Sequence, residues 1–362
     1  MTDSLQEPLR PYVPDVGGQE KPLRIGMYGT AHSHASGKAR ALVAHPQVEF
    51  AGVYEPDAAL RAKGREQPGF AGTRWMESAA ELLDDPSIVA VCVEGDEGNC
   101  WDLARQCVAA GKHMWYDKPC GDWPVFQEII HTAQARRLLV QMGFMLRYGA
   151  AFQQVYGWVR EGLLGDVFAV RGHMSTSSTR EARERARYTG GIAFQLAPHM
   201  IDQAVYLFGG AREGVRPDTV TSFLRNDATP GNPSHADNTL VVLEFDKSAD
   251  RGGGMAMIDI SQMETASPAR RFEVYGTKGS AIVVEPFEPG PTIRLCLDEA
   301  RGAYAKGAQL VPVEPTPRER SYHLELAAFV RTLLGQQLPE RSLDHELLVE
   351  ETLHRAVGTL SR

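Results

Sequence analysis

A strand, a tight turn and the start of a helix follow one another near the beginning of the chain, and this succession constrains the fold most. An apolar run from Ile25 to Tyr28 stops at Gly29, and residues 36–42 then have the pattern of a helix. The amides and the dipole of such a helix N-terminus form an anion site, whose usual ligand is a dinucleotide pyrophosphate. The alternative is an ordinary βαβ turn that holds no ligand.

The glycine fingerprint of this turn is incomplete, because its three positions fall on Gly29, Ala31 and His34. The stronger signal is the next strand, which ends at Glu55, where a Rossmann unit places the acid that binds the adenosine ribose. Such a carboxylate accepts the ribose hydroxyls and repels a 2′-phosphate, so we expect NAD rather than NADP. The predicted cofactor contacts here are Gly29, Thr30, Ala31, His32, His34 and Glu55.

Strands and helices alternate over residues 22–142, which predicts a doubly wound parallel sheet, an α/β Rossmann domain. The predicted strands are 23–28, 48–54, 88–93, 112–116 and 138–142, and the predicted helices are 35–45, 57–66, 78–84, 99–110 and 124–135. Binding residues belong at the carboxyl ends of such strands. Two further groups occupy those ends, Glu94-Gly95-Asp96 and Asp117-Lys118-Pro119, and from them we add Glu94, Gly95, Asp96 and Lys118 to the cofactor contacts.

Residues 143–362 have a different pattern, and a chain of 362 residues is long enough for two domains. Two helices, 150–162 and 193–208, accompany strand-like runs with few helices between them. The runs are 167–174, 219–225, 238–245, 255–263, 271–276, 280–285 and 292–297; a basic loop follows the first of them, and helices 321–335 and 343–360 end the chain. This pattern predicts an α+β domain with a large, mostly antiparallel open sheet.

Composition excludes some classes of protein. The net charge of −8 argues against a general nucleic-acid surface, and no apolar run is long enough to span a membrane. Five cysteines without paired C-x-x-C spacing fit a reduced, cytoplasmic compartment. Residues 1–21 are polar, lack the apolar core of a signal peptide and predict a loosely ordered arm.

Lys118 is the first candidate for chemistry, because it follows a strand and precedes Pro119, which favours an extended backbone. A lysine held beside a cofactor can transfer a proton or hold a substrate hydroxyl once burial lowers its pKa. The alternative is a surface lysine beside a turn, which its place at the end of a strand disfavours.

Gln195, His199 and Asp202 have the spacing i, i+4 and i+7, so a helix presents all three on one face. A histidine on such a face can act as a general acid or base near neutral pH. Equally, the three could be a polar cluster around a buried core histidine.

His32 and His34 form an H-x-H pair inside the predicted phosphate loop. A metal site needs three or four ligands, and the further ligands considered, His173, His199, His235 and Asp202, are remote in sequence. We therefore expect no metal here, with one imidazole donating to the pyrophosphate while the other packs.

These residues together resemble the glucose–fructose oxidoreductase / inositol dehydrogenase (Gfo/Idh/MocA) family. The resemblance covers roughly residues 22–360 and includes the segments 143–148 and 162–166 as well as Asp117-Lys118-Pro119 and Gly190-Gly191 leading to His199. It implies NAD(P)-dependent oxidation or reduction of a sugar, cyclitol or related polyol at a cleft between the domains. Lys118 corresponds to the lysine of the family's Glu-Lys-Pro segment, and His199 to its catalytic histidine.

The chain departs from the family pattern at several positions. Gln195 stands where the family usually has an aspartate, Gly95-Asp96 replaces a Thr-Pro pair, and Cys100 replaces the histidine that usually follows. Ala31 and His34 occupy positions where glycines are common. These differences place the chain in a divergent branch of the family.

The sequence therefore predicts an NAD-dependent oxidoreductase of a carbohydrate-like hydroxyl or its ketone. The expected catalytic residues are Lys118, His199 and Gln195, and the expected substrate contacts are Arg147, Tyr148, His173, Tyr188, Gln195 and Asp202. Two alternatives stay open: redox-assisted elimination from a sugar with NAD regenerated in each cycle, and a catalytically silent protein that binds a nucleotide or sugar. We also expect a homodimer or homotetramer, packed through the sheet that contains residues 255–260.

Overall fold

The computed structural model describes residues 21–96, 98, 100–186, 189–209, 214–247, 253–265 and 269–360. The chain forms two compact units. The first unit contains the residues up to Gly143 together with Leu326–Leu347, and the second contains Phe144–Glu325 with the residues from Leu348 onward. The predicted boundary lies within one residue of this division, but Leu326–Leu347 groups with the first unit. The predicted N-terminal arm lies almost wholly outside the described residues.

The first unit contains a five-stranded parallel sheet in the order β2-β1-β3-β4-β5, which confirms the predicted Rossmann architecture. Its strands are β1 (Leu23–Tyr28), β2 (Val48–Tyr54), β3 (Ile88–Val93), β4 (His113–Tyr116) and β5 (Val140–Met142). These strands are apolar along their whole length because helices cover both faces of a parallel sheet. Ile25, Val91 and Trp115 are accordingly fully buried.

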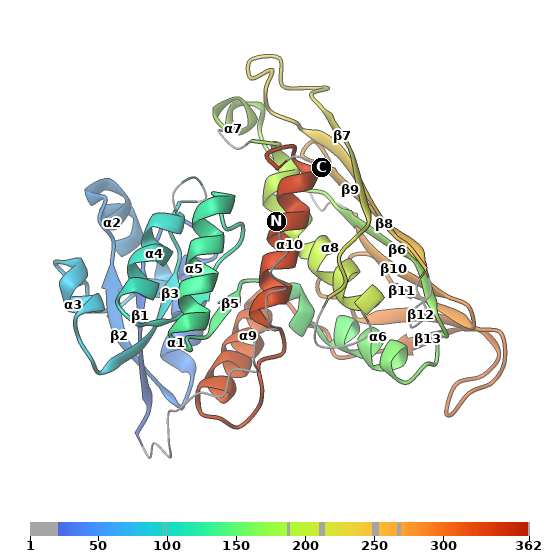
Figure 1. Cartoon of the computed structure of the whole chain (residues 1–362), viewed down its shortest axis with the longest axis horizontal. Helices are drawn as coiled ribbons and strands as arrows, with labels where there is room; N and C mark the ends of the chain where they lie inside the picture. The colour runs from blue at the N-terminus through green and yellow to red at the C-terminus, as the bar shows by residue number, and fades with distance from the viewer. Residues whose placement is uncertain are drawn as a thin grey trace, which may run out of the picture. The chain divides into compact units, whose positions relative to one another are not determined.

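The strand order reverses beside β1, so right-handed crossovers place α1 on one face of the sheet and α4 and α5 on the other. α4 and α5 pack against each other (Figure 1). The helices are α1 (Ala35–Ala44), α2 (Ala58–Arg65), η1 (Pro68–Phe70), α3 (Ala79–Leu83), α4 (Cys100–Ala109) and α5 (Trp123–Ala135). The reversal is the position at which open α/β sheets bind ligands.

A buried ion pair ties the segment Leu326–Leu347 to the first unit. Arg341 donates to a Glu346 carboxylate oxygen at 2.9 Å and to the Met142 carbonyl at 2.7 Å. The Met142 amide in turn donates to Glu346 at 3.2 Å. The sequence prediction had assigned this segment to the second domain, because a contact between residues some 200 positions apart leaves no local pattern.

His113 makes the stability of the first unit depend on pH. The Leu139 amide donates to His113 Nδ1 at 2.9 Å, which requires a neutral ring, and burial lowers the His113 pKa from 6.5 to about 4. Between these two pKa values the His113 ring is protonated in the unfolded chain but neutral in the folded chain. The contribution of neutral His113 to the stability of the fold is therefore complete above pH 6.5 and is lost as the pH falls toward 4. The loss is up to about 3 kcal/mol.

The measurement is hydrogen exchange of β4 and β5 amides at pH 7 and pH 4.5, corrected for intrinsic rates. His113→Gln keeps an acceptor but cannot titrate, so we expect its stability to change less than that of the wild type. Equal changes in both proteins would show that His113 does not contribute.

The second unit contains an eight-stranded sheet in the order β13-β12-β11-β10-β6-β9-β8-β7. All its pairs are antiparallel except β6 with β9, so the predicted mostly antiparallel sheet is confirmed. Its strands are β6 (Val167–Met174), β7 (Thr219–Arg225), β8 (Asn238–Phe245), β9 (Gly254–Ser261), β10 (Arg270–Gly276), β11 (Gly279–Val283), β12 (Thr292–Leu297) and β13 (Gly307–Pro312).

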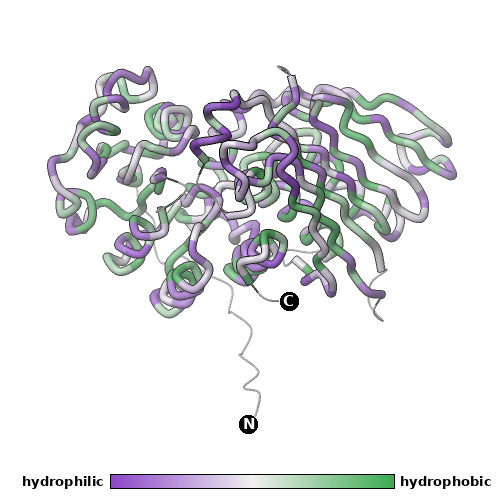
Figure 2. Tube along the Cα trace, turned by 90° about the horizontal axis from the view of Figure 1, so that it is seen from above, coloured by the Kyte–Doolittle hydropathy of each residue, from purple (hydrophilic) through white to green (hydrophobic). Residues whose placement is uncertain are grey.

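Two helices cover one face of this sheet: α8 packs on β6, β8 and β9, and α6 packs on β11 (Figure 1). Burial therefore alternates along the strands, as in β9, and hydrophobic and hydrophilic stretches alternate along them in Figure 2. Including α6 and α8, the helices after Gly143 are η2 (Met145–Tyr148), α6 (Ala150–Arg160), α7 (Arg180–Arg185), α8 (Ile192–Gly209), α9 (Arg318–Leu333) and α10 (Leu343–Ala356).

Two local predictions for the second unit were wrong. The basic loop is in part a helix, α7, whose N-terminus is capped by Thr179 accepting from the Ala182 amide at 3.2 Å. Strand β13 was missed because it is an edge strand in which exposed and half-buried residues alternate and none is fully buried, so the sequence shows no buried apolar face.

The face of the larger sheet opposite α8 is open in the single chain. It contains a hollow of about 640 Å³ lined by charged and apolar side chains, among them Arg171, Phe223 and Met257. The predicted oligomer would cover this face, and it stays a prediction. No helix among the described residues is long and apolar enough to cross a membrane.

Candidate cofactor and catalytic site

The turn after β1 has the geometry that the predicted dinucleotide site requires. Gly29 has a φ of +85°, and a Cβ built there would lie 2.8 Å from the Gly95 amide nitrogen. A side chain at Gly29 would therefore strain the backbone and strike the end of β3. The His34 side chain makes no capping bond at the start of α1, and the Ala35 amide donates to the His32 carbonyl at 3.1 Å. The next amides of the first turn, those of Ser36 and Gly37, suit an anionic group.

Glu55, at the carboxyl end of β2, holds this turn. One of its oxygens accepts from the Thr30 amide at 2.7 Å and from the Thr30 hydroxyl at 3.0 Å. The other accepts from the Asp57 amide at 3.0 Å. The acid predicted from its spacing thus lies beside the glycine turn, and its carboxylate retains lone pairs for ribose hydroxyls.

The residues after β3 divide into two environments. Glu94 is fully buried, and its carboxylate contacts the Lys38 ammonium at 2.8 Å. Asp96 is exposed and accepts from the Gly98 amide at 2.7 Å, while its carbonyl accepts the Cys100 amide at the start of α4. Of the predicted cofactor contacts in this segment, the Glu94 side chain therefore belongs to the interior, whereas Asp96 shapes the turn that begins α4.

Lys118 is buried, with 4% of its surface exposed, and the Asp117 carboxylate accepts its backbone amide at 2.8 Å. A surface lysine beside a turn, the alternative that the sequence left open, does not describe this residue. Burial and a fixed backbone are what a lysine needs to place its amine reproducibly.

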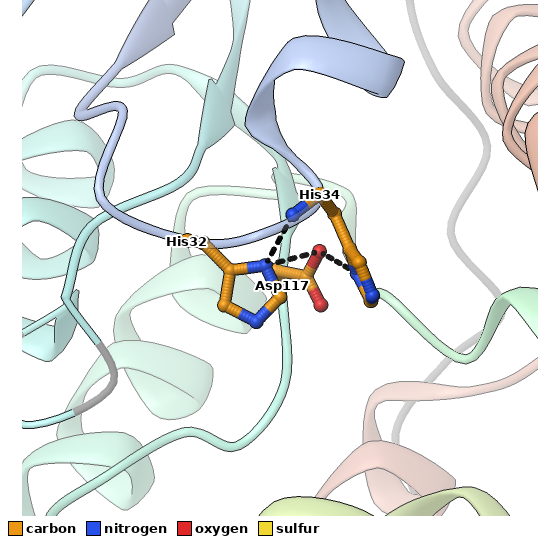
Figure 3. Close-up of side chains that lie close together, drawn as sticks. All are labelled: His32, His34 and Asp117. Atoms are coloured by element: carbon orange, nitrogen blue, oxygen red, sulfur yellow. Dashed lines mark hydrogen bonds and ion pairs between the residues drawn. The ribbon is translucent and has the colours of Figure 1, made fainter. Parts of the chain in front are cut away.

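A cluster of buried polar side chains surrounds Asp117. Lys38 Nζ lies 2.8 Å from Asp117 Oδ2. The Nδ1 atoms of His34 and His32 lie 2.9 and 3.3 Å from the same oxygen (Figure 3). Burial lowers the pKa of His34 to about 3, and the nearby Asp117 carboxylate only partly offsets this. Burial also raises the pKa of Asp117, but His32, Lys38 and His34 outweigh it and hold that pKa well below its usual range.

Lys38 and Asp117 were not among the predicted site residues. Lys38 lies four positions after His34, so it stands on the same side of α1. It is fully buried, with its ammonium 4.3 Å from the centre of the Trp115 ring. A lysine among the alanines of a short helix was the available signal, because a buried lysine needs a partner.

In the second unit, Gln195, His199 and Asp202 all lie on α8, in agreement with the predicted helix. Gly191, with a φ of +58°, precedes the helix, and a Cβ there would lie 2.1 Å from the Ala236 carbonyl oxygen. His199 is buried and Gln195 half-buried. The shared helix follows the predicted spacing; the chemical roles stay predictions.

Arg147 and Asp202, both predicted substrate contacts, bind each other in the interior of the second unit. Arg147 Nε donates to Asp202 at 3.2 Å, Nη2 makes a second, shorter contact, and the two residues are at most 1% exposed. The guanidinium also lies over the Tyr206 ring, 4.4 Å from its centre. Tyr148, which follows Arg147 in η2, is buried as well. Arg147 and Asp202 therefore already have protein groups as their nearest partners.

His173 does not share a surface with Arg147 and Asp202. Its neighbour Gly172 faces Met200 of α8, so the alternation of β6 turns the His173 side chain to the open face of the sheet. There its ring nitrogens contact Asp259 at 2.9 Å and Glu264 at 2.6 Å. Tyr188, the remaining predicted contact, lies outside the described residues.

Two family models match most of the chain. Residues 23–144 match the model of the oxidoreductase family with an NAD-binding Rossmann fold, and residues 152–282 match the Gfo/Idh/MocA C-terminal domain. The chain therefore belongs to the Gfo/Idh/MocA family of oxidoreductases.

Relatives and solved structures extend the comparison. Myo-inositol 2-dehydrogenase of Thermotoga maritima is 26% identical over 200 residues, and the match spans 55% of this chain and 57% of that protein. The scyllo-inositol 2-dehydrogenase (NAD⁺) of Bacillus subtilis is 23% identical over 74% of this chain and 73% of its own. The structure of GenD2 from gentamicin A biosynthesis, solved with NAD, shares the fold at a TM-score of 0.73 and 22% identity, with 95% of each chain covered.

Proposed function

We propose that this protein is an NAD-dependent dehydrogenase that oxidises a secondary hydroxyl of a sugar, cyclitol or related polyol, or reduces the corresponding ketone. The observation that carries the proposal is the first unit's arrangement of Gly29, Glu55 and Lys118, which follow the carboxyl ends of β1, β2 and β4 in the same parallel sheet. Two relatives, at 26% and 23% identity, are named inositol 2-dehydrogenases, which supports a cyclitol or sugar as the substrate class.

The residues present fit a dinucleotide. A pyrophosphate suits the uncapped amides at the start of α1, and the positive φ of Gly29 allows the close turn before them. Glu55 would accept the adenosine ribose hydroxyls. Bound NAD would supply a hydride acceptor or, when reduced, a hydride donor. Lys118 and His199 would flank the reacting hydroxyl, one taking up its proton while the other orients it, and Gln195 would orient the His199 ring.

Purified protein tests the proposal directly. NAD and NADP are titrated by calorimetry, and turnover is followed at 340 nm with a panel that includes myo-inositol, scyllo-inositol and common aldoses. We expect NAD binding and reduction with at least one cyclitol or sugar. Protein that binds NAD but turns over no member of the panel would support a silent binding protein, and NAD recycled during sugar cleavage would support redox-assisted elimination.

Cofactor choice gives a prediction about Glu55. A carboxylate at this position repels a 2′-phosphate, so the wild type should bind NAD at least tenfold more tightly than NADP, and Glu55→Ser should narrow that ratio. The substitution also removes the acceptor of Thr30, so some loss of NAD affinity should accompany it. The control is Glu77→Ser, an exposed acid in the same unit. Tighter NADP binding by the wild type would contradict the prediction.

A further inference from the structure

Three ligand atoms lie close together in the first unit, two from the loop after β1 and one from the end of β4, and Glu94 at the end of β3 approaches one of them. His34 Nδ1 lies 2.9 Å from Asp117 Oδ2, and His32 Nδ1 lies 3.3 Å from that oxygen and 3.4 Å from Glu94 Oε2. The ligand atoms of His32, His34 and Asp117 all lie within 4.8 Å of one another (Figure 3). A tetrahedral metal with bonds of about 2.0–2.1 Å holds its ligand atoms roughly 3.3 Å apart.

The orientation of His32 favours a cation among these atoms. The His34 backbone amide points at His32 Nδ1, 3.3 Å away, so this nitrogen presents its lone pair. The same nitrogen lies 3.3 Å from Asp117 Oδ2 and 3.4 Å from Glu94 Oε2. Electron-rich atoms converge in this way around a cation, and a neutral imidazole with an unprotonated nitrogen is the form that binds a metal.

The charges of the cluster are compatible with a divalent ion. Two neutral imidazoles and two carboxylates give a divalent metal a neutral ligand set. Lys38 Nζ contacts the other Glu94 oxygen, Oε1, at 2.8 Å, and it also contacts Asp117 Oδ2. Lys38 would thus act as a hydrogen-bond donor that orients the two carboxylate ligands. The Lys38 ammonium also competes with a metal ion for these carboxylates.

We propose that His32, His34, Asp117 and Glu94 form a binding site for a divalent transition metal that prefers nitrogen and oxygen ligands, such as Zn²⁺. With Glu94 joining the three clustered ligands around the bound ion, four protein ligands would leave no open position, so the role is structural. The metal would join the loop after β1 to the ends of β3 and β4, and through Asp117 it would fix the backbone of Lys118. The sequence prediction of no metal lacked Asp117 and Glu94 as ligands. The proposal does not depend on the dehydrogenase activity.

The test is a metal titration of the full chain after chelation and dialysis. We expect one equivalent of Co²⁺ per chain with the intense visible bands of tetrahedral coordination, displacement by one equivalent of Zn²⁺, and a higher melting temperature with Zn²⁺. His32→Gln and His34→Gln should each weaken binding at least tenfold. His131→Gln, an exposed histidine of the same unit, should bind as the wild type does.

Lys38→Met separates the proposal from its main rival, in which the ammonium is the only cation of the cluster. The proposal expects wild type and Lys38→Met both to bind one equivalent. Wild-type protein that binds no stoichiometric metal overturns it, whether or not Lys38→Met binds. Binding that is equally tight in His32→Gln and His34→Gln overturns it too. If these variants do not fold, the wild-type cobalt spectrum and zinc competition decide.

Discussion

Alanine at Lys118 or His199 is expected to lower turnover roughly a hundredfold or more, the usual scale for a positioned acid or base. Dinucleotide affinity should stay within a small factor, because Gly29, the loop amides and Glu55 are the proposed determinants of that binding. The measurements are the turnover number at saturating substrate and the NAD dissociation constant for each variant. Lys63→Ala, an exposed lysine of α2, is the matched control.

Gln195 sharpens this test, because a neutral amide can orient an imidazole but cannot stabilise an imidazolium as a carboxylate does. Gln195→Asp should therefore raise the pKa of His199 and move the pH–rate profile to higher pH. A turnover that is insensitive to the substitutions at Lys118, His199 and Gln195 would place the chemistry on other residues. A parallel loss of NAD binding in Lys118→Ala would instead mean that this variant damages the first unit.

The sequence predicted the elements of the first unit closely because parallel strands that are buried on both faces consist of continuous runs of apolar residues. Strands β1, β2 and β3 have the predicted bounds. Glu55 could be placed beside the glycine turn since both positions follow from one local strand–turn–helix pattern. By contrast, the half-exposed strand β13 and the short helix α7 depend on pairing and capping that the local pattern encodes weakly.

The polar interior was much harder to predict, because it depends on contacts between residues distant in sequence. Lys38 meets Asp117 79 positions later in the chain, and Arg147 meets Asp202 after 55. Neither contact produces a periodic pattern in the sequence. The i, i+4, i+7 spacing correctly placed Gln195, His199 and Asp202 on one helix, but it could not tell that Asp202 already has a buried cationic partner.

Arg147→Met should destabilise the second unit by about 3–5 kcal/mol, because it leaves the Asp202 carboxylate buried without its cation. The double variant Arg147→Met with Asp202→Leu should recover most of this loss, since a well-packed apolar pair can replace a buried ion pair. The measurement is hydrogen exchange of α6 and α8 amides, which reports the free energy of opening in this unit.

Arg160→Met provides the control, because Arg160 also approaches Tyr206, with Nη1 3.4 Å from the hydroxyl, but lies exposed at the end of α6. Its loss should change stability by no more than about 0.5 kcal/mol. The experiment also decides between the two roles of Arg147. If Arg147 contacts the substrate, Arg147→Met should raise KM and leave hydrogen exchange in α8 unchanged. If Arg147 is instead the internal partner of Asp202, the variant should accelerate that exchange. The near-complete burial of both side chains favours the second result.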